Sequence, residues 1–364
     1  MFRLASPRRM LMLFAAAAIV GTACGGSPGT GASSPGADVG SGSLTGAGST
    51  FDAPLFQRAF FDYSARYPQV TVNYQAVGSG AGIKQFQANT VDFGASDVPM
   101  GSADISAAGG PDAVTQIPVT LGVVSIAYNL SGVDKLQLDG PTLANIYLGH
   151  ITKWNDPAIA ALNSGVTLPS TNITVVHRSD GSGTTYIFTD YLSKISDEWK
   201  TATGSPAKSI KWLVGVGGAQ NQGVAQAVTS TEGAIGYVEL AYVVQTGMHQ
   251  AYLKNAAGSF LQASVAGATA AAGTNNSISP TNFSITNAGC GQCYPIAGFS
   301  WAILRTNYSD ASKGKAVVNL FKWLVTDGQG DGKDLQYAPL PSAVQQLALT
   351  DLKTIKAGGS TVLS

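Results

Sequence analysis

The chain has 364 residues, with 21 basic and 21 acidic residues and a formal net charge of zero. Charged residues make up only 12% of the sequence. We therefore expect no nucleic-acid partner, because proteins that bind nucleic acids carry a basic surface. An anion would have to be bound by local geometry, since the overall charge will not attract it.

The amino terminus has the pattern of an export signal. Three arginines within the first nine residues precede the apolar run Met10–Val20, which is too short to span a membrane as a mature helix. Small residues then lead to Cys24. This pattern predicts a signal peptide over residues 1–23 and a lipid on Cys24. The alternative is an ordinary signal peptide in which the cysteine is incidental.

The segment after Cys24 is almost purely Gly, Ser, Pro and Ala through residue 43. Such a composition cannot bury enough apolar surface to fold, so residues 24–43 are predicted to form a lipidated, flexible tether. The tether would hold a folded domain at the cell membrane, facing the periplasm or the cell exterior. The chain from Leu44 onward exceeds the usual size of one hydrophobic core, and we expect two lobes.

Short β-branched runs alternate with amphipathic stretches, which is typical of α/β proteins built from βαβ units. The predicted strands include 70–74, 173–176 and 234–238, and the predicted helices are 54–67, 82–89, 184–195, 223–229 and 314–326. Two long apolar runs, Leu121–Leu130 and Ile296–Leu304, are predicted to pass between the lobes. Lobe one would then comprise residues 44–122 and 296–364, and lobe two residues 123–295. The segment Ala266–Asn276 is predicted to be a surface loop.

Cys290 and Cys293 form a CGQC motif near the second long apolar run. In an oxidising compartment they could close a small disulfide loop. A redox CxxC would normally open a helix after a strand, but here Tyr294-Pro295 follows. A structural disulfide is therefore favoured, and whether it forms stays open at this point. A zinc site would need two more ligands, and the chain has only three histidines.

The stretch Arg178–Thr185 (RSDGSGTT) lies between a predicted strand and a predicted helix. Amide groups at a helix start have no intrahelical partner and suit an anion. Arg178 adds a planar fork matched to two phosphate oxygens, and Asp180 could orient it. No lysine follows the glycines, as a P-loop requires, and GSG is too tight for a GxSxG nucleophile. A helix cap without a ligand is the remaining alternative.

Two other turns repeat this chemistry before predicted helices. They are Gly46–Phe51 (GAGSTF) and Val77–Gly82 (VGSGAG). Asp97 follows another short strand-like run and could face the same cleft. An ionised carboxylate can only accept hydrogen bonds, so Asp97 would favour an anion that carries a proton. Hydrogen phosphate has such a proton at neutral pH and sulfate does not. The alternative is that Asp97 is a plain turn residue.

Several segments together resemble the phosphate-binding proteins of the Pst ABC-type uptake system, the PstS family. They include LTGAGSTFDAP, VGSGAGIKQF, NTVDFGASDVPM, RSDGSGTTYIF and YPIAGFSWAIL. The resemblance implies a two-lobed, type II-like periplasmic-binding-protein fold of the α/β class, with a ligand cleft between the lobes. It also implies inorganic phosphate as ligand, with the membrane permease and ATPase subunits of the importer as partners.

The resemblance carries the family's phosphate-binding residues onto eight positions of this chain. They are Thr50, Phe51, Ser79, Asp97, Arg178, Ser182, Gly183 and Thr184, with Asp180 supporting Arg178. No catalytic residue, metal or cofactor is expected, and the protein is expected to be a monomer. Two alternatives remain: a phosphatase with Ser182 or Thr184 as nucleophile, and a receptor for another oxyanion such as sulfate or molybdate.

Overall fold

The computed structural model describes residues 38–363, and from Val39 onward the chain forms one compact unit. The predicted signal peptide, Cys24 and the tether up to residue 37 lie outside the described residues. The predicted end of the tether at residue 43 is too late, because Val39 is already buried and the first strand starts at Gly42. Among residues 38–363, none of the helices combines the length and apolar character that crossing a membrane would require.

The unit is built on one long mixed sheet with the strand order β2-β1-β3-β12-β4-β8-β6-β7, and β9 also pairs with β4. Its strands are β1 (Gly42–Gly48), β2 (Val70–Ala76), β3 (Phe93–Ser96), β4 (Val114–Tyr128), β6 (Thr174–Arg178), β7 (Val216–Gly218), β8 (Ala234–Glu239), β9 (His249–Gln250) and β12 (Ala297–Arg305). Two small sheets are formed by β5 (Gln137–Leu138), β10 (Tyr252–Lys254) and β11 (Phe260–Leu261), and by β13 (Asn307–Tyr308), β14 (Lys356–Ala357) and β15 (Ser360–Thr361).

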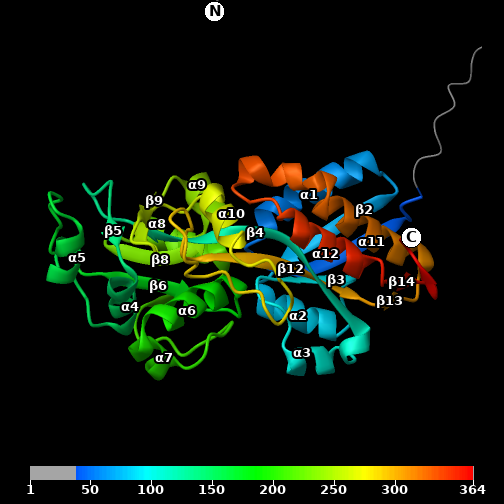
Figure 1. Ribbon diagram of the computed structural model, residues 1–364, viewed down its shortest axis with the longest axis horizontal. Helices are drawn as coiled ribbons and strands as arrows, with labels where there is room; N and C mark the ends of the chain where they lie inside the picture. Colours follow the sequence, from blue (N-terminus) through cyan, green and yellow to red (C-terminus); the bar gives the residue numbers. More distant parts are fainter. Residues whose placement is uncertain (1–37, 364) are drawn as a thin grey trace, which may run out of the picture. The chain divides into compact units, whose positions relative to one another are not determined.

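Helices cover both ends of this sheet (Figure 1). We call β1–β3 and their helices the first half; these helices are α1 (Ala53–Arg66), α2 (Ser79–Gln87), α3 (Ser102–Ala107), α11 (Ala311–Val325) and α12 (Ser342–Leu352). We call β6–β8 and their helices the second half; these helices are α4 (Gly140–Leu148), α5 (Pro157–Leu162), α6 (Gly183–Ile195), α7 (Asp197–Thr203), α8 (Gln220–Ser230), α9 (Leu240–Thr246) and α10 (Val265–Ala272). Two 3-10 helices, η1 (Pro111–Ala113) and η2 (Asp327–Leu335), complete the set.

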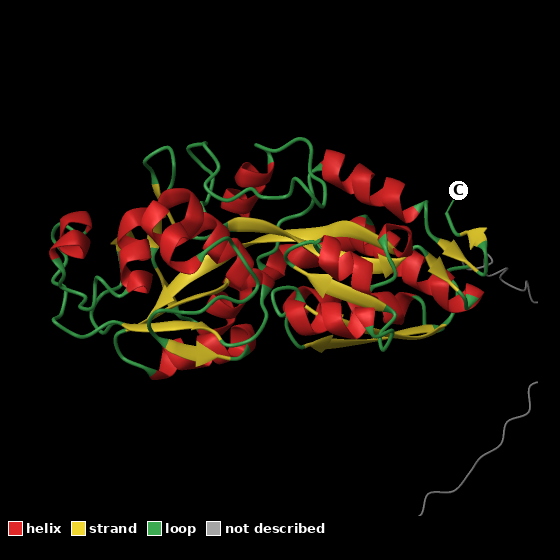
Figure 2. Ribbon diagram, turned by 90° about the horizontal axis from the view of Figure 1, so that it is seen from below, coloured by secondary structure: helices red, strands yellow, loops and turns green. Residues whose placement is uncertain are grey.

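The two long apolar runs form β4 and β12, which connect the halves through the middle of the sheet (Figure 2). They pair antiparallel with each other from Val114 to Val123 of β4. From Val124 onward β4 pairs with β8 of the second half instead. Both strands are buried along nearly their whole length, which explains why they read as continuous apolar runs rather than as alternating ones.

The strand directions decide where a ligand could bind. β1 runs parallel to β2 and β3, and β6 runs parallel to β7 and β8. In open α/β sheets, ligands bind beyond the carboxyl ends of parallel strands. All three glycine- and hydroxyl-rich turns follow such ends, after β1, β2 and β6. Each predicted helix and strand is present, with its ends displaced by a few residues.

The predicted surface loop at Ala266–Asn276 is wrong over most of its length. Val265–Ala272 is helix α10, capped by the Ser264 hydroxyl, which accepts from the Gly267 amide at 3.1 Å. Ala268 and Ala271 are buried in the core. Alanine has the highest helix propensity, and the glycine and asparagine around it obscured this signal.

Cys290 and Cys293 form a disulfide, as the sequence favoured. The loop that it closes is tied down by Asn255, whose Nδ2 donates to the carbonyls of Cys290, Gly291 and Cys293 at 3.1 Å each. Cys293 is fully buried. The pair therefore lies in a structural position beside β12.

Candidate anion-binding site

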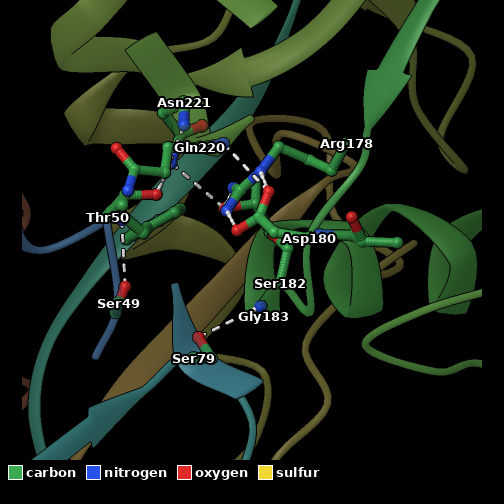
Figure 3. A network of polar contacts seen from close by, with 12 residues as sticks. Ser49, Thr50, Ser79, Arg178, Asp180, Ser182, Gly183, Gln220 and Asn221 are labelled. Atoms are coloured by element: carbon green, nitrogen blue, oxygen red, sulfur yellow. Dashed lines mark hydrogen bonds and ion pairs between the residues drawn. The ribbon is translucent and has the colours of Figure 1, made fainter. Parts of the chain in front are cut away.

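Polar turns from both halves meet at the middle of the sheet. They follow the carboxyl ends of β1, β2, β3, β6, β7 and β8, and the parallel strands of the two halves point these ends toward each other. Figure 3 shows Ser49, Thr50 and Ser79 of the first half facing Arg178, Asp180, Gly183 and Asn221 of the second. The predicted site residues are thus brought together in one place.

Arg178 is the last residue of β6, and its side chain is almost completely buried. Its Nε and Nη2 donate to the two carboxylate oxygens of Asp180 at 2.8 and 2.5 Å (Figure 3). Burial opposes the ionisation of Asp180, but the hydrogen bonds and charge of Arg178 outweigh it and lower the pKa of Asp180. The remaining nitrogen, Nη1, lies 3.5 Å from the Thr184 hydroxyl. Asp180 therefore fixes two of the three guanidinium nitrogens by hydrogen bonds.

Ser182 and Gly183 begin helix α6. Ser182 is the N-cap, and its hydroxyl accepts from the amide of Thr185 at 3.1 Å. The amide of Gly183 points to the first half and donates to the Ser79 hydroxyl at 3.1 Å (Figure 3). A Cβ on Gly183 would lie 2.6 Å from the Asp97 side chain. Glycine is thus required by the close approach of the two halves.

Thr50 and Thr184 are linked by Asn221, a residue outside the predicted set. Asn221 Nδ2 donates to the Thr50 hydroxyl at 3.0 Å and lies 3.3 Å from the Thr184 hydroxyl. Asn221 is fully buried in the first turn of α8. The glycine-rich stretch GGAQN at the end of β7 carries the same strand-to-helix signal as the selected turns, so this residue could have been found.

Phe51 contributes backbone groups only. Its amide donates to the Ser49 hydroxyl at 2.9 Å, and its carbonyl accepts from Tyr337 at 2.6 Å. The Ser49 hydroxyl in turn lies 2.5 Å from Asp97 Oδ1. Ser49 stands directly before Thr50 in the GAGSTF turn, and it too was missed.

Asp97 follows β3 and is 2% exposed. Its Oδ1 accepts from Ser49 at 2.5 Å and from Ser300 at 2.8 Å, whereas Oδ2 has only a long contact of 3.5 Å with Ser79. Burial raises the pKa of Asp97 to about 6, although the serines and the charge of Arg178 oppose the rise. Oδ2 is therefore the oxygen with unused acceptor capacity.

The burial of charge distinguishes this place from the rest of the described chain. In residues 38–363 the buried charged side chains are Asp52, Asp97, Arg178 and Glu239, and all four lie at the ends of these strands. Burial of charge is costly unless the charge is paired and hydrogen-bonded. Such a concentration of perturbed groups marks a functional site.

His177, beside Arg178 on β6, is packed rather than catalytic. Its ring stacks on Trp212 with centroids 4.7 Å apart, and its Nδ1 lies 3.1 Å from the Arg178 carbonyl. Burial lowers its pKa. The described residues also contain no group of three or more His, Cys, Asp or Glu side chains that could hold a metal ion.

A groove of about 750 Å³ runs beside the site, between α1 of the first half and α8–α9 of the second. Glutamine, alanine and threonine side chains line much of it, and none of the eight predicted residues does. Tyr242 connects the two places, because it lines the groove and its hydroxyl donates to the Thr50 carbonyl at 2.6 Å. The groove therefore lies at the outer edge of the contact between the halves.

Comparison with known proteins agrees with this geometry. A family model described as a PBP superfamily domain matches residues 33–327. The chain is 44% identical over 302 residues to the phosphate-binding protein PstS of Xylella fastidiosa, covering 82% of this chain and 81% of that protein. The chain belongs to the PstS family. A PstS protein of Pasteurella multocida is 41% identical over 318 residues, with 85% and 90% of the two chains covered.

Solved structures show the same fold at lower identity. A high-affinity periplasmic phosphate-binding protein bound with phosphate superposes with a TM-score of 0.70 at 22% identity, covering 85% of this chain and 93% of that one. The predicted α/β periplasmic-binding-protein fold is thus confirmed, and so is the resemblance to PstS.

Proposed function

We propose that this chain binds inorganic phosphate between its two halves and delivers it to an ABC-type importer, without chemical conversion. The observation that carries this proposal is the concentration of buried charged side chains where the strand ends of the two halves meet. There, the guanidinium of Arg178 and the carboxylate oxygen Oδ2 of Asp97 face hydroxyl and amide groups. Its relatives are named phosphate-binding proteins, which supports binding rather than catalysis.

The eight predicted residues would provide the ligand with hydrogen bonds from both halves. Thr50, Phe51 and Ser79 would donate from the first half, where Asp97 would accept the proton of the ligand. Donors from the second half are Arg178, Ser182, Gly183 and Thr184, with Asp180 orienting the guanidinium. Hydrogen bonds to a charged group stabilise by about 1.5–3 kcal/mol each, so such a set can bind phosphate without a metal.

Ligand entry requires the halves to separate. Gly183 donates to Ser79, and Asn221 donates to Thr50, directly across the contact. Phosphate would replace these contacts and bridge the same groups. The moving bodies are residues 44–122 with 296–364, and residues 123–295. The change of β4 from β12 to β8 between Val123 and Val124 supports this boundary.

The amino-terminal segment would place the protein at the cell membrane. Signal peptidase would remove residues 1–23, a lipid on Cys24 would anchor the chain, and the tether would let the domain reach the permease from the periplasmic or outer face. The mature protein would act as a monomer. A Cys24→Ala variant should appear in the soluble fraction instead of the membrane fraction.

Isothermal titration calorimetry of the purified domain tests the binding proposal. Phosphate should bind at micromolar affinity or tighter, which corresponds to about 8 kcal/mol or more, and sulfate should not compete. Molybdate in the same competition series separates a phosphate receptor from a receptor for other oxyanions. Equal affinity for phosphate and sulfate would contradict the role of Asp97.

A further inference from the structure

Asp52 is a buried carboxyl group to which the proposed phosphate site gives no role. It is the N-cap residue of α1, yet its side chain makes no capping hydrogen bond. The residue is fully buried, and Oδ1 has no hydrogen-bond partner in the described structure. Its Oδ2 lies 2.5 Å from the hydroxyl of Ser300.

Ser300 stands between two carboxyl groups. Its hydroxyl, at a register irregularity of β12, lies 2.5 Å from Asp52 Oδ2 and 2.8 Å from Asp97 Oδ1. A serine hydroxyl has a single proton to donate. It cannot donate to two ionised carboxylates at once, so the pair of short contacts requires a further proton on Asp52 or on Asp97.

The surroundings place this proton on Asp52. Asp97 accepts from Ser49 and feels the charge of Arg178, both of which favour its ionised form. Asp52 has neither a hydrogen bond from Ser49 nor this favourable charge. Burial, as the larger cause, and the charge of Asp97 raise the pKa of Asp52 well above the usual range. Asp52 in turn raises the pKa of four other groups, which are Glu239, Tyr74, Tyr242 and Tyr337. None of these groups is a cation.

We infer that Asp52 is a protonated carboxylic acid that donates to Ser300 and so leaves the Ser300 hydroxyl to donate to Asp97. Asp52 is thereby a positioning residue for anion selectivity, because it keeps Asp97 an ionised acceptor. If Asp97 carried the proton instead, the site would lose the negative charge that rejects a fully ionised anion. This role for Asp52 rests on the proposed binding of phosphate, whereas its protonation does not.

Infrared spectroscopy of the ligand-free protein tests the protonation. Above neutral pH, the spectrum of the wild type minus that of Asp52→Asn should contain a carboxylic-acid C=O band, because the amide of the variant can still donate to Ser300 but has no acid form. The difference spectrum is needed because burial also raises the pKa of Glu239 well above its usual range, and this carboxyl can contribute a band of its own. Asp134→Asn, a substitution of an exposed aspartate, is the control and should keep the band. A difference spectrum without this band would overturn the inference.

Anion binding tests the consequence. Asp52→Asn should bind phosphate within about threefold of the wild type and still exclude sulfate, because an exchange that keeps the hydrogen bond changes little. Ser300→Ala and Asp52→Leu should each narrow the preference for phosphate over sulfate by about tenfold or more. Both should also move the acid limit of phosphate binding to higher pH.

Two results would contradict this role. One is an Asp52→Asn variant that binds phosphate much more tightly, which would mean that an ionised Asp52 repels the ligand. The other is an unchanged preference in Ser300→Ala. If Asp52→Leu does not fold, Asp52→Asn and Ser300→Ala decide. A wild-type protein that does not bind phosphate would refute the proposed function, while the infrared result would still report on Asp52.

Discussion

The two halves bring different charged groups to the same site. The second half supplies Arg178 and the amino-terminal end of helix α6, both of which attract negative charge. The first half supplies hydroxyl groups and the buried carboxyl groups of Asp52 and Asp97. Under the proposed function both halves would donate to the anion, but only the second half would supply a positive charge, and only the first half would supply the carboxylate that tests whether the anion carries a proton. Affinity and selectivity would then depend on different residues.

Arg178→Ala should have the largest effect on affinity. Truncating one member of a buried, hydrogen-bonded charge pair costs about 2–5 kcal/mol, which is roughly 30- to 5,000-fold in the phosphate Kd. Calorimetry measures the loss. Arg58→Ala is the matched control, because Arg58 is an exposed arginine paired with Asp62 on α1. A loss below about tenfold for Arg178→Ala would break the assignment of affinity to the second half.

Gly183→Ala should cause the second-largest loss of phosphate affinity, because the added methyl group obstructs the approach of the two halves. The added Cβ would lie 2.6 Å from the Asp97 side chain. Overpacking of this kind costs about 1–3 kcal/mol, or roughly 5- to 150-fold in Kd. Gly101→Ala is the control, since its Cβ would meet no heavy atom within 4 Å. Equal affinity of the two variants would show that the halves do not close as tightly in solution.

The pH dependence of phosphate binding tests the contribution of Asp97 in the first half. The pKa of Asp97 is raised to about 6 by burial, and only its ionised form accepts the proton of the ligand. The contribution of ionised Asp97 to phosphate affinity should be complete above the pKa of Asp97 and should decline as the pH falls through it. Well below this pKa, the affinity should fall by up to tenfold per pH unit. The ratio of wild-type to Asp97→Asn affinity, measured from about pH 8 to about pH 5, cancels the titration of phosphate itself. A constant ratio would contradict an ionised acceptor at Asp97.

Removal of the disulfide should have the smallest effect on binding. Replacing both Cys290 and Cys293 by serine opens a short loop, for which the chain-entropy relation gives about 2 kcal/mol of unfolding free energy. Urea unfolding measures that change. The phosphate Kd should stay within about threefold, because neither cysteine is among the site residues. A larger change in Kd would couple this loop to the site.

The turns of the site were predictable where the signal is local. Arg178, Ser182 and Gly183 stand together between a strand and a helix, and the anion-binding property of a helix start depends on neighbouring residues alone. The alternation of strand and helix patterns likewise predicts the α/β class. These features depend on short stretches of chain, which is why they can be read without coordinates.

The partners that come from other elements could not be found in this way. Ser300 lies within a buried strand, where a single serine looks like any small core residue. Its position between Asp52 and Asp97 depends on the pairing of β12 with β3 and β4. Asp52 at a helix start has the pattern of an ordinary N-cap, and only the structure shows that its carboxyl group turns away from the helix.

The selectivity of Asp97→Asn tests the separation of affinity and selectivity most directly. Competition calorimetry of the wild type and the variant, with phosphate and sulfate at neutral pH, gives the two preference ratios. Phosphate affinity should change little, because an amide oxygen can still accept a hydrogen bond. Sulfate affinity should rise enough to narrow the preference by about tenfold or more. A variant that rejects sulfate as strongly as the wild type would contradict the account.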